Sequence, residues 1–154
     1  LFTICIHPDQ SREVLDISAG HWQAPEIVQR IYDIHHRYHS IIYIEDNAAQ
    51  YFIRQWLNGA TAVPVKPFNT GKNKMDPAFG VESLAAEFYG GRWVIPEFGT
   101  ASLLAERYIW INERYFYAQG KHTGDSLMAC WIAREGARQG SLKVEVGRKD
   151  WFTR

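Results

Sequence analysis

Residues 41–50 read Ile-Ile-Tyr-Ile-Glu-Asp-Asn-Ala-Ala-Gln, and this stretch decides how the rest of the chain is interpreted. Its first four residues are all β-branched or aromatic, which is typical of a short buried strand. The strand ends at two carboxylates, Glu45 and Asp46, which Asn47 follows. Ligands bind at the carboxyl ends of strands in open α/β sheets, so these side chains are candidate functional groups. The alternative is that Asp46 or Asn47 caps the next helix while Glu45 is solvated.

The composition indicates one folded domain with no global preference for a charged partner. The 154 residues are 46% hydrophobic and 14% aromatic, and 17 basic residues balance 17 acidic ones. Affinity for nucleic acid would therefore need a local basic patch. No apolar run is long enough to span a membrane and no export signal is present, so we expect a soluble, unexported protein. We expect Cys5 and Cys130 to be reduced core residues, and the start at Leu1, inside an apolar run, indicates a fragment of a longer protein.

The first half of the chain alternates strand and helix patterns. We expect a hairpin of strands at 1–6 and 13–18, a helix from Pro25, the strand 41–45, a helix at 48–57 and a strand at 61–65. The buried face of the first helix is predicted to consist of Ile27, Ile31, Ile34 and Tyr38. That of the second is predicted to consist of Phe52, Ile53 and Trp56. This order predicts an α/β fold with parallel pairing across the helical crossovers. The pair His35 and His39 has metal-ligand spacing but no third ligand nearby, so a solvated helix end explains it better.

The second half begins with a basic, turn-rich loop at 66–74. The later patterns predict a helix at 76–89, an edge strand at 92–96, a long helix from Thr100, a helix from Asp125 to Gly140 and a polar tail at 141–154. Asp76 is expected to cap the first of these helices. Its buried face is expected to consist of Val81, Leu84, Ala85 and Phe88. Residues 1–140 therefore make up the predicted domain.

Two acids and a basic loop suggest a metal-dependent reaction on a phosphodiester. Asp125 begins the last predicted helix, and its alternative role is that of a helix N-cap. Carboxylates that converge from different elements can hold Mg²⁺ or Mn²⁺, and two such ions about 4 Å apart promote phosphodiester cleavage. Lys66, Lys72 and Lys74 in the loop are candidate phosphate contacts, although a solvated loop would have the same composition. No nucleotide-binding Gly-x-x-x-x-Gly-Lys-Ser/Thr motif occurs.

Four motifs in order along the chain resemble the nuclease domain of tailed-phage terminase large subunits. They are Ile-Glu-Asp-Asn-Ala-Ala-Gln at 44–50, Thr-Gly-Lys-Asn-Lys at 70–74, Arg-Trp-Val-Ile-Pro at 92–96 and His-Thr-Gly-Asp-Ser-Leu-Met-Ala at 122–129. The resemblance implies a ribonuclease-H-like, three-layer α/β/α fold with a mixed central sheet. It also implies a two-metal endonuclease that uses Mg²⁺ or Mn²⁺ to cut concatemeric viral DNA during genome packaging.

The resemblance assigns roles residue by residue. Glu45 and Asp125 match two of the family's three acids, as catalytic residues and metal ligands, with Asp46 as the substitute for Glu45. Asn47 and His122 lie beside them in the motifs. The third acid belongs to the first strand of the family's sheet, which would precede Leu1, so this fragment alone is expected to lack activity. Asp16 is a poor substitute because it lies mid-strand and points away from Leu15 and Ile17.

The implied partners are double-stranded DNA, an upstream ATPase domain, the small terminase subunit and the portal protein, in the cytoplasm of a bacterial host of a phage or prophage. Two alternatives remain. One is a ribonuclease-H-like resolvase or transposase, and the other is a DNA-binding or docking module that has lost the metal chemistry. The implied strand order places the absent strand between the hairpin and the strand 41–45. We therefore expect that slot to be filled either by residues upstream of Leu1, or by rearrangement or a strand from another copy.

Overall fold

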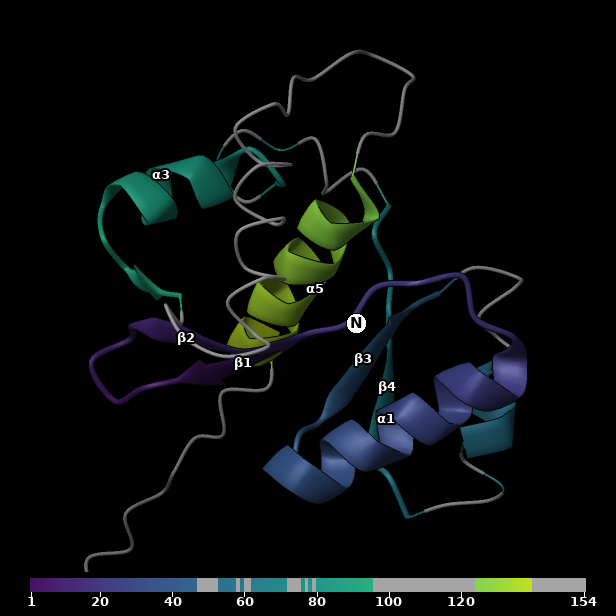
Figure 1. Cartoon of the computed structure of the whole chain (residues 1–154). Coiled ribbons are helices and arrows are strands. Elements are labelled where there is room, and N and C mark those ends of the chain that lie inside the picture. Colours follow the sequence, from purple (N-terminus) through teal and green to yellow (C-terminus); the bar gives the residue numbers. More distant parts are fainter. Residues whose placement is uncertain are drawn as a thin grey trace, which may run out of the picture.

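The computed structural model describes residues 1–46, 53–57, 59, 62–71, 76, 78, 80–95 and 124–139. These residues form a mixed α/β structure (Figure 1). Its elements are β1 (Phe2–Ile6), β2 (Arg12–Ile17), α1 (Ala24–Tyr38), β3 (Ile42–Glu45), β4 (Val65–Phe68), α3 (Ser83–Tyr89), β5 (Trp93–Val94) and α5 (Asp125–Gln139). Residues 53–57 are also helical.

The strands that the structure describes form two separate sheets. The first has the order β1-β2-β5, with β1 antiparallel to β2 and β5 parallel to β2. The second consists of β3 and β4, which pair in parallel from Ile42 with Val65 to Glu45 with Phe68. The predicted opening hairpin is therefore confirmed, and so is parallel pairing across the crossover that follows β3.

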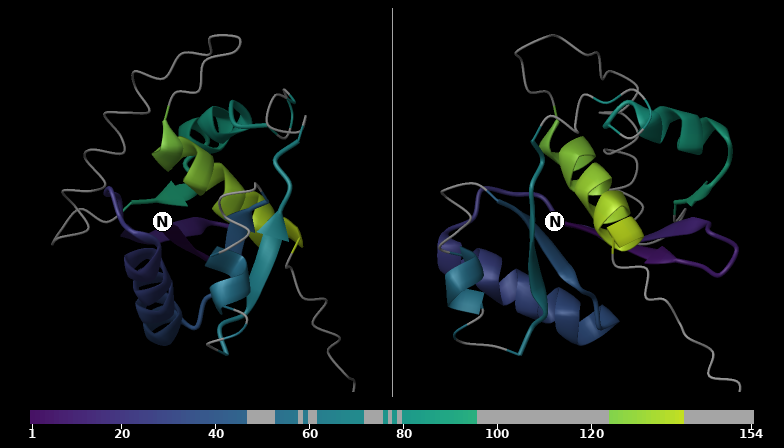
Figure 2. Two further views of the ribbon diagram at one scale, coloured as in Figure 1. Left: turned by 90° about the vertical axis from the view of Figure 1, so that its right-hand side faces the viewer. Right: turned by 180° about the vertical axis from the view of Figure 1, so that it is seen from behind.

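Helices α1 and α5 pack on opposite faces of β3 and β4 (Figure 2). Side chains alternate along a strand, so Tyr43 joins the core beside α5 while Ile42 and Ile44 join the core beside α1. On the α5 side, the ring of Phe68 meets Trp131 edge to face, with centroids 5.4 Å apart. On the α1 side, Ile31, Leu57 and Val63 are buried. The described elements thus form helical layers on both faces of the β3–β4 pair.

Helix α1 matches its prediction because its start is determined locally. Pro25 lies in the first turn, and Gln23 and Glu26 form a capping box across it. His39 ends the helix in the left-handed conformation, and the Nδ1 atom of His35 lies 2.8 Å from the carbonyl oxygen of Ser40. Both histidines therefore belong to the helix terminus.

The structure corrects the predicted bounds of one strand and one helix and the buried face of another helix. Strand β4 covers Val65–Phe68 rather than 61–65, because the register with β3 selects the paired residues. Helix α3 begins at Ser83 rather than after Asp76, whose carboxylate instead accepts the N–H of Ala78 in a turn. Trp56 is 48% exposed, and Leu57 is the buried residue among the described part of that helix.

The remaining predicted helical faces and cysteines can be compared in part. Val81 and Leu84 are buried as predicted, whereas Ala85 is exposed. Both cysteines are free thiols, with Cys130 buried and Cys5 partly buried. The predicted helix from Thr100, the start of the helix at 48–52 and the tail at 141–154 lie outside the described residues.

Candidate functional site

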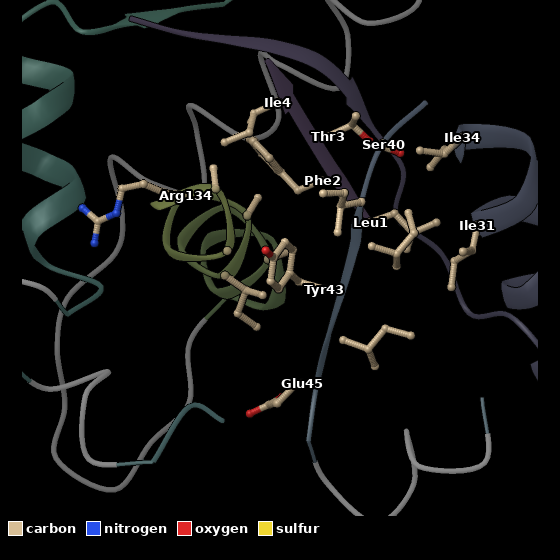
Figure 3. Close-up of a pocket in the computed structure, with 18 of the residues that line it drawn as sticks. Leu1, Phe2, Thr3, Ile4, Ile31, Ile34, Ser40, Tyr43, Glu45 and Arg134 are labelled. Atoms are coloured by element: carbon tan, nitrogen blue, oxygen red, sulfur yellow. The ribbon is translucent and has the colours of Figure 1, made fainter. Parts of the chain in front are cut away.

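Glu45 is the last residue of β3, and its carboxylate lies on the α5 side of the strand. The side chains of Tyr43 and Glu45 project from the same side of β3 (Figure 3). The main chain is held at this point because the N–H of Asp46 donates to the carbonyl of Phe68 at 2.8 Å. The hydroxyl of Thr70 donates to Oε1 of Glu45, also at 2.8 Å. Pairing with β4 and one hydrogen bond from the following loop therefore position this acid.

Asp125 is the first residue of α5, and it does not occupy the N-cap position. The carbonyl of Gly124 accepts the N–H groups of Leu127 and Met128, both at 3.1 Å, so Gly124 is the residue that precedes the helix. Gly124 has a φ of 98°, a conformation that favours glycine. The capping interpretation of Asp125 is therefore wrong. An acid in the first turn is still favourable there because it complements the helix dipole.

Glu45 and Asp125 line the same cavity, although they come from different elements. The cavity has a volume of about 810 Å³ and lies among β1, β3, α1 and α5. The carboxyl end of β3 and the amino end of α5 therefore face one space. That the two carboxylates meet at one metal site stays a prediction.

The structure favours Glu45 over Asp46 as the site residue. Nη1 of Arg54 lies 3.0 Å from Oδ1 of Asp46, so this carboxylate is already in an ion pair. Asp46 does not line the cavity. Asp16 does not line it either, and its carboxylate lies 3.7 Å from the guanidinium of Arg37. Glu45 is therefore the better candidate.

The predicted DNA contacts are only partly described. Lys66 belongs to β4 rather than to the loop, so that assignment is corrected. Its ammonium lies 5.8 Å from the centroid of the Tyr43 ring. The other predicted residues, Lys72, Lys74, Asn47 and His122, lie outside the described residues.

The two carboxylates are ligands of the kind that Mg²⁺ and Mn²⁺ prefer, but two carboxylates do not complete the coordination shell of such an ion. Mg²⁺ is usually bound by one or two carboxylates, with waters and substrate phosphates completing the shell, and Glu45 and Asp125 could supply two such oxygens. Within the described parts of the chain, no group of three His, Cys, Asp or Glu side chains is placed to hold a metal ion. A metal held by Glu45 and Asp125 would therefore need further oxygen ligands.

Sequence reasoning missed two side chains near these acids. Thr70 was recognised only as part of a motif, and its contact with Glu45 depends on the register between β3 and β4. Tyr43 was identified only as a strand residue, yet its hydroxyl is buried and lines the cavity. The two-residue spacing from Tyr43 to Glu45 could have shown that they share a face.

Among the described residues, no helix combines the length and apolar character that crossing a membrane requires. Comparison of the chain with protein-family models, with curated proteins and with solved structures found no match.

Proposed function

We propose that this chain is a metal-dependent DNA endonuclease domain of the tailed-phage terminase type. The observation that carries the proposal is that Glu45 and Asp125, from separate motifs, line one cavity. The mixed α/β arrangement with α1 and α5 on opposite faces of β3 and β4 is compatible with a ribonuclease-H-like fold, which forms part of the proposal.

In the proposed reaction, different residues would bind the metal, orient its ligand and contact the DNA. Glu45 and Asp125 hold Mg²⁺ or Mn²⁺, which when bound activates a water and stabilises the leaving oxygen of a phosphodiester. Thr70 orients Glu45 by donating a hydrogen bond to one carboxylate oxygen. Lys66, Lys72 and Lys74 contact the DNA backbone. The proposed partners are double-stranded DNA, an ATPase domain in the same polypeptide, the small terminase subunit and the portal protein, in the cytoplasm of the bacterial host.

The test replaces each acid by its amide in a chain that includes the residues upstream of Leu1. Glu45→Gln and Asp125→Asn should each reduce Mn²⁺-dependent nicking of supercoiled plasmid by at least about 100-fold, because loss of even a residue that supports a metal ligand costs about 10- to 100-fold. Asp46→Asn is the matched control, because Asp46 is adjacent in sequence but pairs with Arg54 outside the cavity. Its nicking rate should stay near the wild-type rate.

Mn²⁺ binding, measured by calorimetry, separates loss of the site from loss of folding. The two cavity variants should bind Mn²⁺ more weakly while their circular dichroism spectra remain unchanged. Wild-type nicking by both variants would contradict the assignment. DNA binding without metal-dependent cutting by the unsubstituted protein would instead support the docking-module alternative.

A further inference from the structure

Thr70 holds one oxygen of the Glu45 carboxylate and leaves the other oxygen open. The Thr70 hydroxyl donates to Oε1 of Glu45 at 2.8 Å. Among the residues that the structure describes, no other group hydrogen-bonds to this carboxylate, so Oε2 accepts no hydrogen bond from them. Glu45 lines the cavity that it shares with Asp125 (Figure 3). A cation in this cavity would therefore find Oε2 available and Oε1 already engaged.

The ends of the two parallel strands place Thr70 beside Glu45. In the register of β3 and β4, Glu45 pairs with Phe68, two residues before Thr70. Thr70 is half-buried, whereas its neighbours Asn69 and Gly71 are exposed. Gly71 has a φ of 36°, in the left-handed region that favours glycine, so the chain turns directly after Thr70. Because threonine is β-branched, few χ1 rotamers are open to it, and its hydroxyl reaches Glu45 from a fixed position.

The donor to Glu45 is neutral, and this decides how much of the carboxylate's charge remains. A hydroxyl donates a hydrogen bond without carrying a charge, so Glu45 stays fully negative while one of its oxygens is held. The neighbouring acid Asp46 is instead bound by the guanidinium of Arg54 at 3.0 Å, which neutralises it. The Thr70 bond therefore restricts the orientation of Glu45 and leaves its charge for a cation.

Divalent cations differ in how they use a carboxylate. Ca²⁺ takes about six to eight oxygen ligands in a flexible geometry, and it can bind both oxygens of one carboxylate. Mg²⁺ is smaller, demands a nearly octahedral shell and keeps several of its waters. Mn²⁺ also favours an octahedral shell of oxygens. A carboxylate that offers one oxygen therefore suits Mg²⁺ and Mn²⁺, whereas a carboxylate that can turn both oxygens toward the ion suits Ca²⁺.

We propose that Thr70 determines which divalent cation the site of Glu45 and Asp125 accepts, because it restricts Glu45 to binding through Oε2 alone. This restriction favours Mg²⁺ and Mn²⁺ over Ca²⁺. To bind Ca²⁺ through both oxygens, the carboxylate would have to turn away from the Thr70 hydroxyl and lose a charge-assisted hydrogen bond. The inference rests on the proposed function, since it needs Glu45 to be a metal ligand, and it adds the ion selectivity of that site.

A purely structural role of Thr70 would have a different effect on metal binding. If the hydroxyl only tied the loop after β4 to the end of β3, its removal would loosen the site for every ion alike. The affinities for Mn²⁺ and Ca²⁺ would then fall together, and their ratio would stay the same. The ratio of the two affinities, measured on the same variant, therefore separates ion selection from support of the loop.

The test measures the Kd of Mn²⁺ and the Kd of Ca²⁺ by isothermal titration calorimetry, on the chain that is used for the nicking assay. Thr70→Val keeps the shape of the side chain and removes the hydroxyl. In this variant, the ratio of the Ca²⁺ Kd to the Mn²⁺ Kd should fall by at least about 10-fold, the lower limit for loss of a residue that supports a metal ligand. Thr70→Ala, which also lacks the hydroxyl but adds no second methyl group, should show the same change.

Three control variants accompany these two. Thr70→Ser keeps the hydroxyl and removes the methyl group, so it should retain the wild-type ratio. Asn69→Ala changes an exposed neighbour in the same loop and should also retain it. In the background of Glu45→Gln, Thr70→Val should have no effect on the ratio, because the carboxylate on which Thr70 acts is then absent. Circular dichroism spectra should be the same for all variants.

Two results would overturn the inference and leave the proposed function standing. The first is an unchanged ratio in Thr70→Val while Mn²⁺ binding still depends on Glu45, which would mean that the hydroxyl does not select the ion. The second is an equal loss of affinity for both ions, which would mean that Thr70 only supports the loop. Wild-type affinities of Glu45→Gln for both ions would instead overturn the proposed metal site, and this inference with it.

Discussion

Glu87 joins α3 electrostatically to β2 and α5, and its removal is a sharp test of how the described fold is held together. Its Oε1 atom lies 3.2 Å from Nη2 of Arg12 and 3.4 Å from Nη1 of Arg134. The indole N–H of Trp93 donates to Oε2 at 3.2 Å. The Arg12 and Arg134 side chains are only 9% and 1% exposed, so water cannot replace this carboxylate.

Glu87→Gln keeps the size of the side chain and removes its charge. Breaking a buried ion pair by removing one partner costs about 3–5 kcal/mol, because the remaining charge is left buried. Arg134 retains a second carboxylate, that of Glu135 at 3.0 Å, whereas Glu87 is the only acid that the described residues place in an ion pair with Arg12. We therefore expect a loss near the lower limit, about 3 kcal/mol.

The free energy of unfolding is measured by urea titration, with circular dichroism as the signal. Glu82→Gln is the matched control, because Glu82 is exposed at the start of the same helix and should change stability by no more than about 0.5 kcal/mol. Arg12→Met should remove much of the effect of Glu87→Gln in a double-mutant cycle. A loss below about 1 kcal/mol for Glu87→Gln would refute the reasoning, because it would place the network outside the stabilising core.

Two further variants test the basic loop and the contact between α5 and β3. Replacing both Lys72 and Lys74 by Ala should weaken DNA binding for all sequences and reduce the slope of log K against log salt by about two units; an unchanged slope would mean that the loop is merely solvated. Gly136→Ala should lower the free energy of unfolding in urea by about 1–3 kcal/mol through overpacking, because the added Cβ would lie 2.5 Å from Cδ2 of Tyr43. Greater stability of this variant, from the roughly 1 kcal/mol that Ala gains over Gly in a helix, would contradict the close contact.

Local signals explain which elements the sequence predicts well. The start of α1 follows from Pro25 and the Gln23–Glu26 capping box, and its end precedes the break before β3. The hairpin follows from alternating strands around a polar turn, in which the N–H of Ser11 donates to the carboxylate of Asp9. These signals involve only residues close together in the sequence, so the sequence alone is enough to predict the elements that they start or end.

The predicted bounds are wrong where contacts with residues far away in the sequence determine which residues form the element. Strand β4 includes Pro67, which removes a donor from a ladder, so the sequence favours placing the strand earlier. In the parallel register, however, Lys66 and Phe68 are the residues turned toward β3, and Pro67 faces away from β3, so its missing N–H removes no donor from this ladder. The sequence Asp76-Pro77 is typical of a helix start. In the structure, however, Asp76 begins a turn in which its carbonyl accepts the N–H of Gly80.

The choice between Glu45 and Asp46 shows the same limit at the candidate site. Adjacent strand residues point to opposite faces, so only one of them can face α5, and the sequence does not say which. Pairing with β4 settles the face, and Arg54 then neutralises Asp46. The shared cavity of Glu45 and Asp125 depends on how α5 packs against β3, which no local pattern encodes.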